Sequence, residues 1–294
     1  VLAEMTQLEH LDISSDKITD TGIEALCKLT NLKYLAPSHS SNSLLTDASL
    51  EAISKLTNLE GLDCSSELFT VQGVEKLASL KKLRRLGMGF GDLDDHCLEV
   101  IAGMEHMESL SLSGLTVGGI NKLNRLTKLK DVQFRKVKKD GQILNLSGLN
   151  QLEYIYLIME IRYDEKTRNQ KELFLSDCDI QCFVNKPNLN FFCISGIGLD
   201  DENFKIIAAM KSLNNLQLSG PTRLTDHAFE WFSPESPMHV MRIKEGHFTA
   251  AGLKSLEKLK NLEILALTSD TAFAPKDVIE FKKNSPVKDL QLKP

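Results

Sequence analysis

A pair of cysteines is the first feature that could bind a metal ion. Cys178 and Cys182 are four residues apart, so a helix would present both thiols on one face. A structural zinc site needs four ligands, and no second Cys/His pair at zinc spacing follows. We therefore expect no metal site and no cofactor. We interpret all six cysteines as reduced thiols in small apolar spaces, with Cys64 in the core: Cys27, Cys64, Cys97, Cys178, Cys182 and Cys193.

Acidic residues and glycines cluster between residues 87 and 96. Asp94 and Asp95 stand where other segments carry Thr-Asp, so capping of a helix N-terminus explains them better than cation binding does. The GMGFG run at residues 87–91 lacks the GxGxxG and GxxxxGK[ST] spacings of phosphate loops. It favours a smooth stretch of surface beside Arg85 and Phe90, and it argues against a nucleotide site.

The seven histidines are scattered over the chain and share no position with a serine, cysteine or aspartate partner: His10, His39, His96, His106, His227, His239 and His247. A nucleophilic enzyme needs its nucleophile, its base and an orienting group close together. The sequence therefore indicates no catalytic residues and a protein that is not an enzyme.

The composition is that of a globular protein with a small excess of acid. The chain has 294 residues, with 35 Lys+Arg against 40 Asp+Glu, a net charge of −5 and 42% hydrophobic residues. This charge disfavours nucleic acid and anionic membranes as partners. The longest apolar stretch, at about residues 154–159, is far shorter than the roughly 20 residues of a membrane span. Free thiols add a preference for a cytoplasmic location.

The elements that would position a site come from a repeat that runs through the whole chain. Apolar residues recur at relative positions 1, 4 and 6, as in Leu8, Leu11 and Ile13. Successive starts are 22–27 residues apart except for one step of 37, and they are Leu8, Leu32, Leu59, Leu83, Met107, Leu129, Leu152, Leu189, Leu213, Met238, Leu262 and Val287. Such spacing predicts twelve short strands.

A segment with helical periodicity follows each predicted strand. Thr19-Asp20 leads into apolar residues spaced three apart, at Ile23, Leu26 and Leu29. Thr and Asp suit a helix N-cap because their side-chain oxygens accept hydrogen bonds from the free N–H groups of the first turn. Further segments of this kind begin at Thr46, Asp94, Asp200 and Thr225. Each repeat is therefore predicted to consist of a strand, a turn and a short helix, and it must stack on its neighbouring repeats.

The pattern LxxLxL, followed by ITDxGIxxLxxL at residues 18–29, resembles the leucine-rich repeats of the TDxGL class. That class occurs in F-box proteins and in bacterial, notably planctomycete, repeat proteins, although the regular cysteine-bearing turn of the F-box type is missing here. The resemblance covers essentially all 294 residues. It implies an α/β fold, a right-handed leucine-rich repeat horseshoe or solenoid with about 11–12 parallel strands on its concave face, short helices on its convex face, and a role in binding.

We expect a single leucine-rich repeat domain over residues 1–294. Both ends cut a repeat, which favours a domain excised from a longer chain. The long step between Leu152 and Leu189 contains a charged insertion at about residues 159–171, on the rim of the predicted concave wall. The insertion is either a solvated loop or a part of the binding surface.

Side chains at relative positions 3, 5 and 7 of each strand should face the concave surface, because side chains alternate along a strand. Two of the four tyrosines, Tyr154 and Tyr156, fall there in one strand, with Arg135 one strand before and Phe191 one strand after. Tyrosine and arginine are frequent in binding hot spots, although aromatic residues also simply suit strands. The predicted partner-binding residues are Arg135, Tyr154, Tyr156, Phe191, Arg85 and Phe90.

Uniform repeats with no catalytic group predict a non-enzymatic protein-interaction module or scaffold that binds a protein or peptide partner on its concave face. Twelve strands about 4.8 Å apart would form a wall roughly 53 Å long, which suits a macromolecule. The alternative is the ligand-sensing or substrate-receptor portion of a larger protein, such as a ubiquitin-ligase adaptor, an immune sensor or a host-directed effector. The sequence identifies neither the partner nor the oligomeric state.

Overall fold

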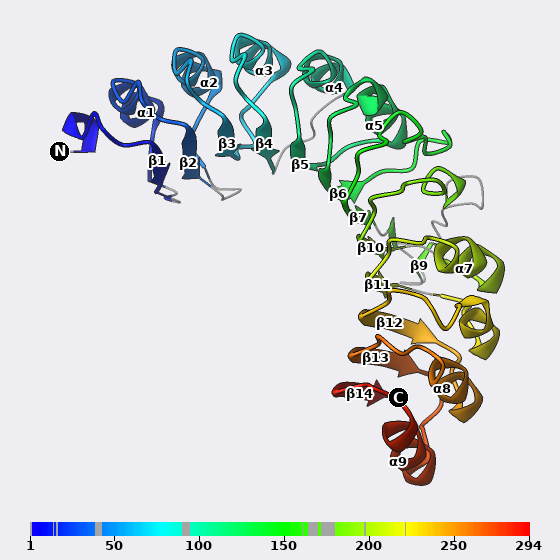
Figure 1. The fold of residues 1–294 in the computed structure, drawn as a ribbon. Coiled ribbons are helices and arrows are strands. Elements are labelled where there is room, and N and C mark those ends of the chain that lie inside the picture. Colours follow the sequence, from blue (N-terminus) through cyan, green and yellow to red (C-terminus); the bar gives the residue numbers. More distant parts are fainter. Residues whose placement is uncertain are drawn as a thin grey trace. The chain divides into compact units, whose positions relative to one another are not determined.

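Strands and short helices alternate along the chain in the computed structural model (Figure 1). The structure describes residues 2–13, 15, 17–38, 43–89, 95–160, 162–163, 170–171, 180–196, 198–220 and 222–294. The chain forms two compact units, Val1–Leu149 and Asn150–Pro294. Within each unit the strands lie on one side and the helices on the other (Figure 1).

The first unit contains six strands among its described residues, and they pair in parallel in the order of the chain. The strands are β1 (His10–Asp12), β2 (Tyr34–Ser38), β3 (Gly61–Cys64), β4 (Arg85–Met88), β5 (Ser109–Ser113) and β6 (Asp131–Val137). The helices are η1 (Leu2–Glu4), α1 (Asp20–Leu26), α2 (Asp47–Ile53), α3 (Val71–Leu77), α4 (Asp95–Ala102), α5 (Val117–Lys122) and η2 (Leu123–Arg125), where η marks a 3-10 helix.

The second unit also contributes six parallel strands in chain order. They are β7 (Tyr154–Met159), β10 (Phe191–Ser195), β11 (Asn215–Ser219), β12 (Val240–Gly246), β13 (Ile264–Ser269) and β14 (Asp289–Lys293). The helices that the structure describes here are α7 (Asp201–Ala208), η3 (Asp226–Trp231), α8 (Ala250–Leu256) and α9 (Pro275–Asn284). The twelve predicted strands, their parallel pairing and the helices behind them are confirmed.

Leucines and phenylalanines of successive repeats stack into a core between the strands and the helices. Leu35 and Leu62 lie opposite each other in paired strands and are fully buried. In the second unit the rings of Phe204 and Phe248 lie 6.2 and 4.9 Å from that of Phe229, and all three side chains are completely buried. Burying each such side chain contributes roughly 1.5–3 kcal/mol to folding, which explains why the apolar period persists along the chain.

The Thr-Asp pairs that begin the helices also join each repeat to the next. Asp20, the first residue of α1, accepts hydrogen bonds from the backbone N and the Oγ1 of Thr46, at 2.9 and 2.7 Å. Thr46 is the N-cap of α2 in the following repeat. The same link, which we call the Asp–Thr ladder, joins Asp47 to Thr70, Asp95 to Thr116, Asp201 to Thr225 and Asp226 to Thr249.

The predicted N-caps are confirmed in part. Thr46, Thr225 and Asp200 accept a hydrogen bond from a backbone N–H in the first turn of their own helix, and Asp200 forms a capping box with Asn203. Thr19 occupies the N-cap position of α1 as predicted, but its side chain accepts no hydrogen bond from the first turn. Asp94 lies outside the described residues.

A glycine at the third position of several helices makes room for the ladder. A Cβ at Gly252, the third residue of α8, would collide with Oδ1 of Asp226, and Gly73 and Gly119 hold the equivalent positions beside Asp47 and Asp95. Gly22 is different, because it lies in the first repeat described and a Cβ there would meet only the Ile18 side chain, at 3.1 Å. At Gly73, Gly119 and Gly252, the glycine therefore serves the contact between repeats.

Left-handed backbone recurs at relative position 8 of several repeats. Gly114, Gly196 and Gly220, each directly after a strand, have φ angles of 83°, 81° and 114°, and the equivalent residues inside β6 and β12 are Lys136 (50°) and Glu245 (65°). A side chain in this region costs about 1–3 kcal/mol unless the surroundings hold it. The carbonyl of Glu245 accepts hydrogen bonds from the backbone N (3.2 Å) and Oγ1 (2.6 Å) of Thr222, which hold the turn in place.

The insertion after β7 contains two short strands that do not belong to the parallel repeat. Strands β8 (Arg162–Tyr163) and β9 (Gln170–Lys171) pair with each other in antiparallel fashion. Residues 161, 164–169 and 172–179 lie outside the described residues, so the proposed contact of the insertion with a partner stays a prediction. Among the described residues, none of the helices has both the length and the apolar run that crossing a membrane requires.

Candidate functional site

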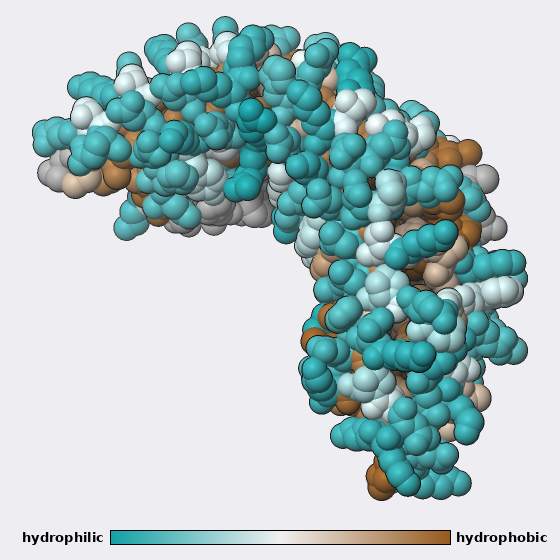
Figure 2. All heavy atoms as spheres, in the orientation of Figure 1, coloured by the Kyte–Doolittle hydropathy of each residue, from teal (hydrophilic) through white to brown (hydrophobic). Residues whose placement is uncertain are grey.

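In each unit, one side of the strands carries none of the helices that the structure describes, and we call the side chains at positions 3, 5 and 7 of the strands the strand face. In β5 the side chains of Ser109, Ser111 and Ser113 are half-buried on this face, while Leu110 and Leu112 between them are buried in the core. The surface over the helices is mostly hydrophilic (Figure 2). The strand face is therefore the surface of each unit on which aromatic side chains outside the core would indicate a binding site.

Two aromatic rings are stacked on the strand face of the second unit. The rings of Tyr154 in β7 and Phe191 in β10 have centroids 4.1 Å apart and planes inclined by 7°. The two residues lie opposite each other in the register of these paired strands, and Tyr156 follows on β7 at the next outward position. All three side chains are half-buried. We call them the aromatic cluster; stacking restricts the rings before any partner arrives, which reduces the entropy lost on binding.

Cys193 stands at an outward-facing position of β10 and is nevertheless buried, as expected for a thiol in a small apolar space. It lies opposite Tyr156 on one side and Gln217 on the other, and only 7% of the residue is exposed. A small side chain between two longer ones is covered even at an outward position. Burial raises the pKa of the Cys193 thiol to about 11.

Arg135 belongs to β6 of the first unit, and Tyr154, Tyr156 and Phe191 belong to the second. Arg135 is exposed on the strand face, where its Nη2 donates a hydrogen bond to Oε1 of Gln133 at 3.3 Å. The predicted neighbourhood of Arg135 and the tyrosines stays a prediction.

Arg85 lines a hollow of about 570 Å³ on the first unit, together with His10, Lys33, Tyr34, Glu60, Gly61, Arg84, Glu108 and Ser109. Gly61 lies between Tyr34 and Arg85 in the strand register, and its missing side chain leaves space that the Tyr34 ring leans into. The hydroxyl of Tyr34 donates to Oδ2 of Asp63 at 2.6 Å. Arg85 itself is exposed and makes no ion pair with the described residues, so the hollow presents an accessible cation beside a fixed aromatic ring.

Asp131 is a polar residue of this face that the sequence reading did not single out. Its Oδ1 is buried and has no hydrogen-bond partner among the described residues. Burial raises the pKa of this carboxyl, against the opposing effects of Gln133 and Arg85. No sequence signal distinguishes it, because aspartate at a strand position usually reaches solvent.

Phe90, the remaining predicted contact residue, lies outside the described residues, as do Asp92 and Asp94. Gly87 is described, and it is buried because the Asp63 carboxylate occupies the space where its side chain would be. At Gly87, the surface that was expected to be smooth is covered by the neighbouring Asp63 carboxylate.

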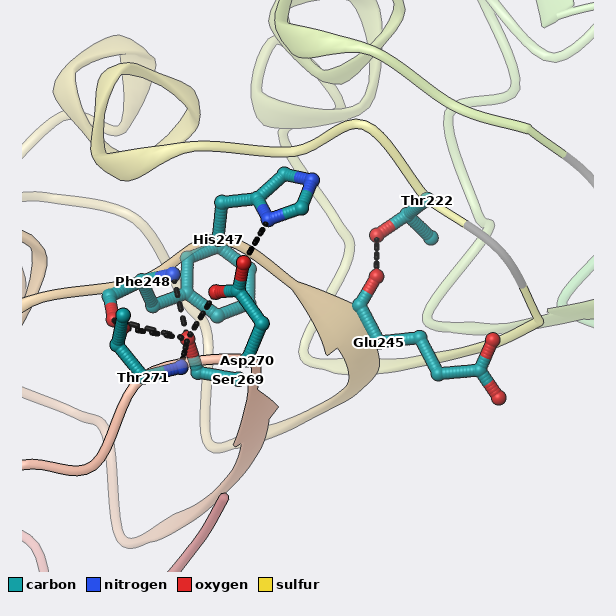
Figure 3. Close-up of polar contacts among 7 residues, drawn as sticks. All are labelled: Thr222, Glu245, His247, Phe248, Ser269, Asp270 and Thr271. Atoms are coloured by element: carbon teal, nitrogen blue, oxygen red, sulfur yellow. Dashed lines mark hydrogen bonds and ion pairs between the residues drawn. The ribbon is translucent and has the colours of Figure 1, made fainter.

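A serine, a histidine and an aspartate come together at the ends of β12 and β13, but they do not form a nucleophilic group (Figure 3). Nδ1 of His247 lies 2.7 Å from Oδ2 of Asp270. Ser269 Oγ is used differently: it accepts a hydrogen bond from the Phe248 N–H at 2.8 Å and donates to the Phe248 carbonyl at 2.9 Å. The buried serine therefore ties two loops together and is not activated by the histidine.

Metal binding finds no support in the part of the chain that the structure describes, where no three His, Cys, Asp or Glu side chains are grouped to hold an ion. Cys182 is not part of a disulfide, whereas Cys178 lies outside the described ranges. Cys64 is buried in the core as predicted, and none of the five cysteines that the structure describes forms a disulfide.

Solved structures with the same alternation of strands and helices resemble this chain over most of its length. An internalin, InlF from Listeria monocytogenes, matches with a TM-score of 0.63 and 17% identity over 98% of this chain and 75% of its own. TLR13 in a complex with ssRNA13 matches with a TM-score of 0.62 and 19% identity over 91% of this chain and 37% of its own. The fold is a leucine-rich repeat solenoid. No protein-family model and no curated protein matches the sequence.

The thiol of Cys193 in this leucine-rich repeat solenoid should react slowly and with a steep pH dependence. The thiolate is the reactive form, so with a pKa of about 11 its fraction rises roughly tenfold per pH unit up to that value. At pH 8 we expect alkylation by iodoacetamide on the order of 100-fold slower than in the urea-unfolded chain, whose thiols have pKa values of about 8.5. Peptide mass spectrometry measures both rates, and equal rates in the folded and unfolded chains would contradict the expectation.

Proposed function

We propose that this leucine-rich repeat chain is a non-enzymatic interaction module that binds a protein or peptide partner on its strand face. The observation that carries this proposal is the stacked pair of Tyr154 and Phe191, with Tyr156 beside it, on a face that no helix covers. Tyrosine is enriched in binding hot spots because it combines a large apolar area with a directed hydrogen bond.

The first unit supplies further candidate contacts. Arg85 presents its guanidinium in the hollow beside Tyr34, and Arg135 is exposed on β6. Phe90 is retained as a contact from the sequence alone. We propose these residues as further contacts for a protein partner on the strand face of the first unit.

A protein partner is favoured over nucleic acid. The TLR13 structure is a complex with ssRNA, but the present chain has a net charge of −5, and phosphate backbones bind to surfaces with an excess of cations. The five free cysteines support a reducing, cytoplasmic setting for the interaction.

Oxidative footprinting tests the proposal once a partner has been captured. Hydroxyl radicals modify exposed aromatic side chains, so a bound partner should protect Tyr154, Tyr156 and Phe191. Trp231, which is 43% exposed on η3 beside Lys205, lies among the helices and should keep its modification rate. Protection of Trp231 together with unchanged rates in the aromatic cluster would place the partner elsewhere and refute the proposal.

The same capture distinguishes the narrower roles that the TDxGL resemblance implies. A substrate receptor should be recovered together with ubiquitin-ligase subunits, whereas a sensor should bind its ligand without them.

A further inference from the structure

Three basic side chains lie together on the strand face near the end of the second unit. Arg242 and Lys244 occupy positions 5 and 7 of β12, and Lys293 occupies position 7 of β14. Arg242 is half-buried and the two lysines are exposed, and none of the three makes an ion pair with another described residue. We call these residues the basic patch.

The strand between them leaves the cations accessible. β13 contributes Ala266 and Thr268 at positions 5 and 7, opposite Arg242 and Lys293 respectively. These small side chains cannot screen the longer cations on either side. The patch therefore surrounds a shallow area in which carboxylates of a partner could meet more than one cation.

Nearby carboxylates are mostly engaged elsewhere. Asp289 accepts hydrogen bonds from Nε2 of Gln291 at 3.1 and 3.3 Å, and Asp270 is paired with His247 at 2.7 Å. Glu245 is adjacent to Lys244 in the chain, and its side chain extends away from His247 and Asp270 (Figure 3). Positions 5 and 7 of β11 to β14 hold the three cations and no acid, in a chain that is acidic as a whole.

A row of side chains that are apolar except for Asn215 lies beside the basic patch at position 3, and we call it the apolar row. The register places Tyr154, Phe191, Asn215, Val240 and Ile264 next to one another on β7, β10, β11, β12 and β13. All five are half-buried. Four strand gaps make the row about 19 Å long, which is the length of a helix of about 13 residues.

We propose that the partner of the second unit is an amphipathic protein segment with acidic residues along one side. Its apolar side chains lie along the apolar row, and its carboxylates meet Arg242, Lys244 and Lys293. This inference rests on the proposed function, because it assumes that the strand face binds protein, and it adds the chemistry of the partner. Complementary charge fixes the direction and side of the segment, whereas the apolar row supplies contact area.

Three fluorescein-labelled helical peptides of about 13 residues serve as probes for fluorescence anisotropy. The first carries leucines along one face and glutamates beside them, the second has lysine in place of glutamate, and the third has serine in place of leucine. We expect the glutamate–leucine probe to bind at least about tenfold more tightly than either of the others, and to weaken as salt is raised.

Charge reversal locates the binding. The variant Arg242→Glu/Lys244→Glu/Lys293→Glu should lose at least about tenfold in affinity for the glutamate–leucine probe, and the neutral variant with glutamine at the three positions should lose less. The matched control reverses three exposed lysines of α8 and α9, Lys254→Glu/Lys276→Glu/Lys283→Glu, and changes the net charge equally. It should bind the probe with only a small loss. Unfolding midpoints confirm that each variant is folded.

Several results would overturn the inference. They are equal affinity for the glutamate and lysine probes, an equal loss in the control variant, or no binding of the glutamate–leucine probe while a single-stranded RNA oligonucleotide binds. If the acidic probe fails to bind but a captured partner still protects Tyr154 and Tyr156, the proposed acidic character of the partner is wrong and the proposed function stands. If the acidic probe binds and those tyrosines remain unprotected, the proposed centre of binding is wrong.

Discussion

Replacing Tyr154 and Tyr156 together by alanine should weaken partner binding about thirtyfold or more while leaving the chain folded. Truncating a hot-spot residue typically costs about 2 kcal/mol or more in binding free energy, which corresponds to roughly thirtyfold in affinity. The cost to folding is smaller, because both side chains are already partly exposed, and the substitution removes the stacking of Tyr154 on Phe191. Such a stacked pair contributes about 0.5–1.5 kcal/mol, so Tm should fall by only a few degrees.

Calorimetric titration of the captured partner measures the affinity, and thermal unfolding measures the stability. Trp231→Ala is the control, because it removes a partly exposed aromatic side chain from η3 on the helix side. It should leave the affinity unchanged. If the double tyrosine variant binds as well as the native chain, the centre of binding must instead be sought at Arg85 and its hollow or in the insertion.

The same substitution should have opposite effects at two equivalent glycines. Gly252→Ala should destabilise the chain by about 2 kcal/mol, because the new Cβ would displace the Asp226 carboxylate from Thr249 and leave hydrogen-bonding groups unpaired. Gly22→Ala should be neutral or stabilising by up to about 1 kcal/mol, because alanine favours helix and only the movable Ile18 side chain is close.

The comparison is well matched because Gly22 and Gly252 are both the third residue of a seven-residue helix. Urea unfolding, monitored by circular dichroism, measures the change in the free energy of unfolding that each substitution causes. Equal changes in unfolding free energy at Gly22 and Gly252 would show that the ladder does not determine which residue is tolerated at this position. Natural exceptions fit the argument: Ser49 donates its hydroxyl to Asp20, and Ala228 lies in the 3-10 helix η3.

The spacing of apolar residues sufficed to predict the strands and their parallel order. Positions 4 and 6 are buried in the inner repeats, so residues such as Leu110 and Leu112 carry their own signal. In the first and last repeats Ile13, Leu290 and Leu292 are half-buried. The links between repeats were missed, because a single Thr-Asp pair reads as a helix cap. Its recurrence about 24 residues later is the signal that could have revealed the ladder between Asp20 and Thr46.

Outward positions were harder to predict than buried ones, since exposure depends on the neighbouring strands. Tyr154 and Phe191 were correctly assigned to adjacent strands, but their stacking depends on side-chain orientation that the sequence does not give. Cys193 was predicted to face outward and is covered. The charges of Arg242, Lys244 and Lys293 were visible in the sequence, but their isolation from acidic partners required the structure.

The Asp–Thr ladder has a consequence for how such a chain can change its length. In the repeats that carry both residues, those of Thr46-Asp47 and Thr225-Asp226, the threonine donates to the repeat before and the aspartate accepts from the repeat after. The helices α3, α5 and α8 begin with Val71, Val117 and Ala250 in place of aspartate, so a tandem duplication or a deletion, as unequal crossing-over would produce, leaves every joint complete where the repeat concerned carries both residues. Insertions of other lengths break a joint unless they loop out, as the extra residues after β7 do. Gain or loss of whole repeats is thus the change in length of the binding face that breaks the fewest hydrogen bonds between repeats.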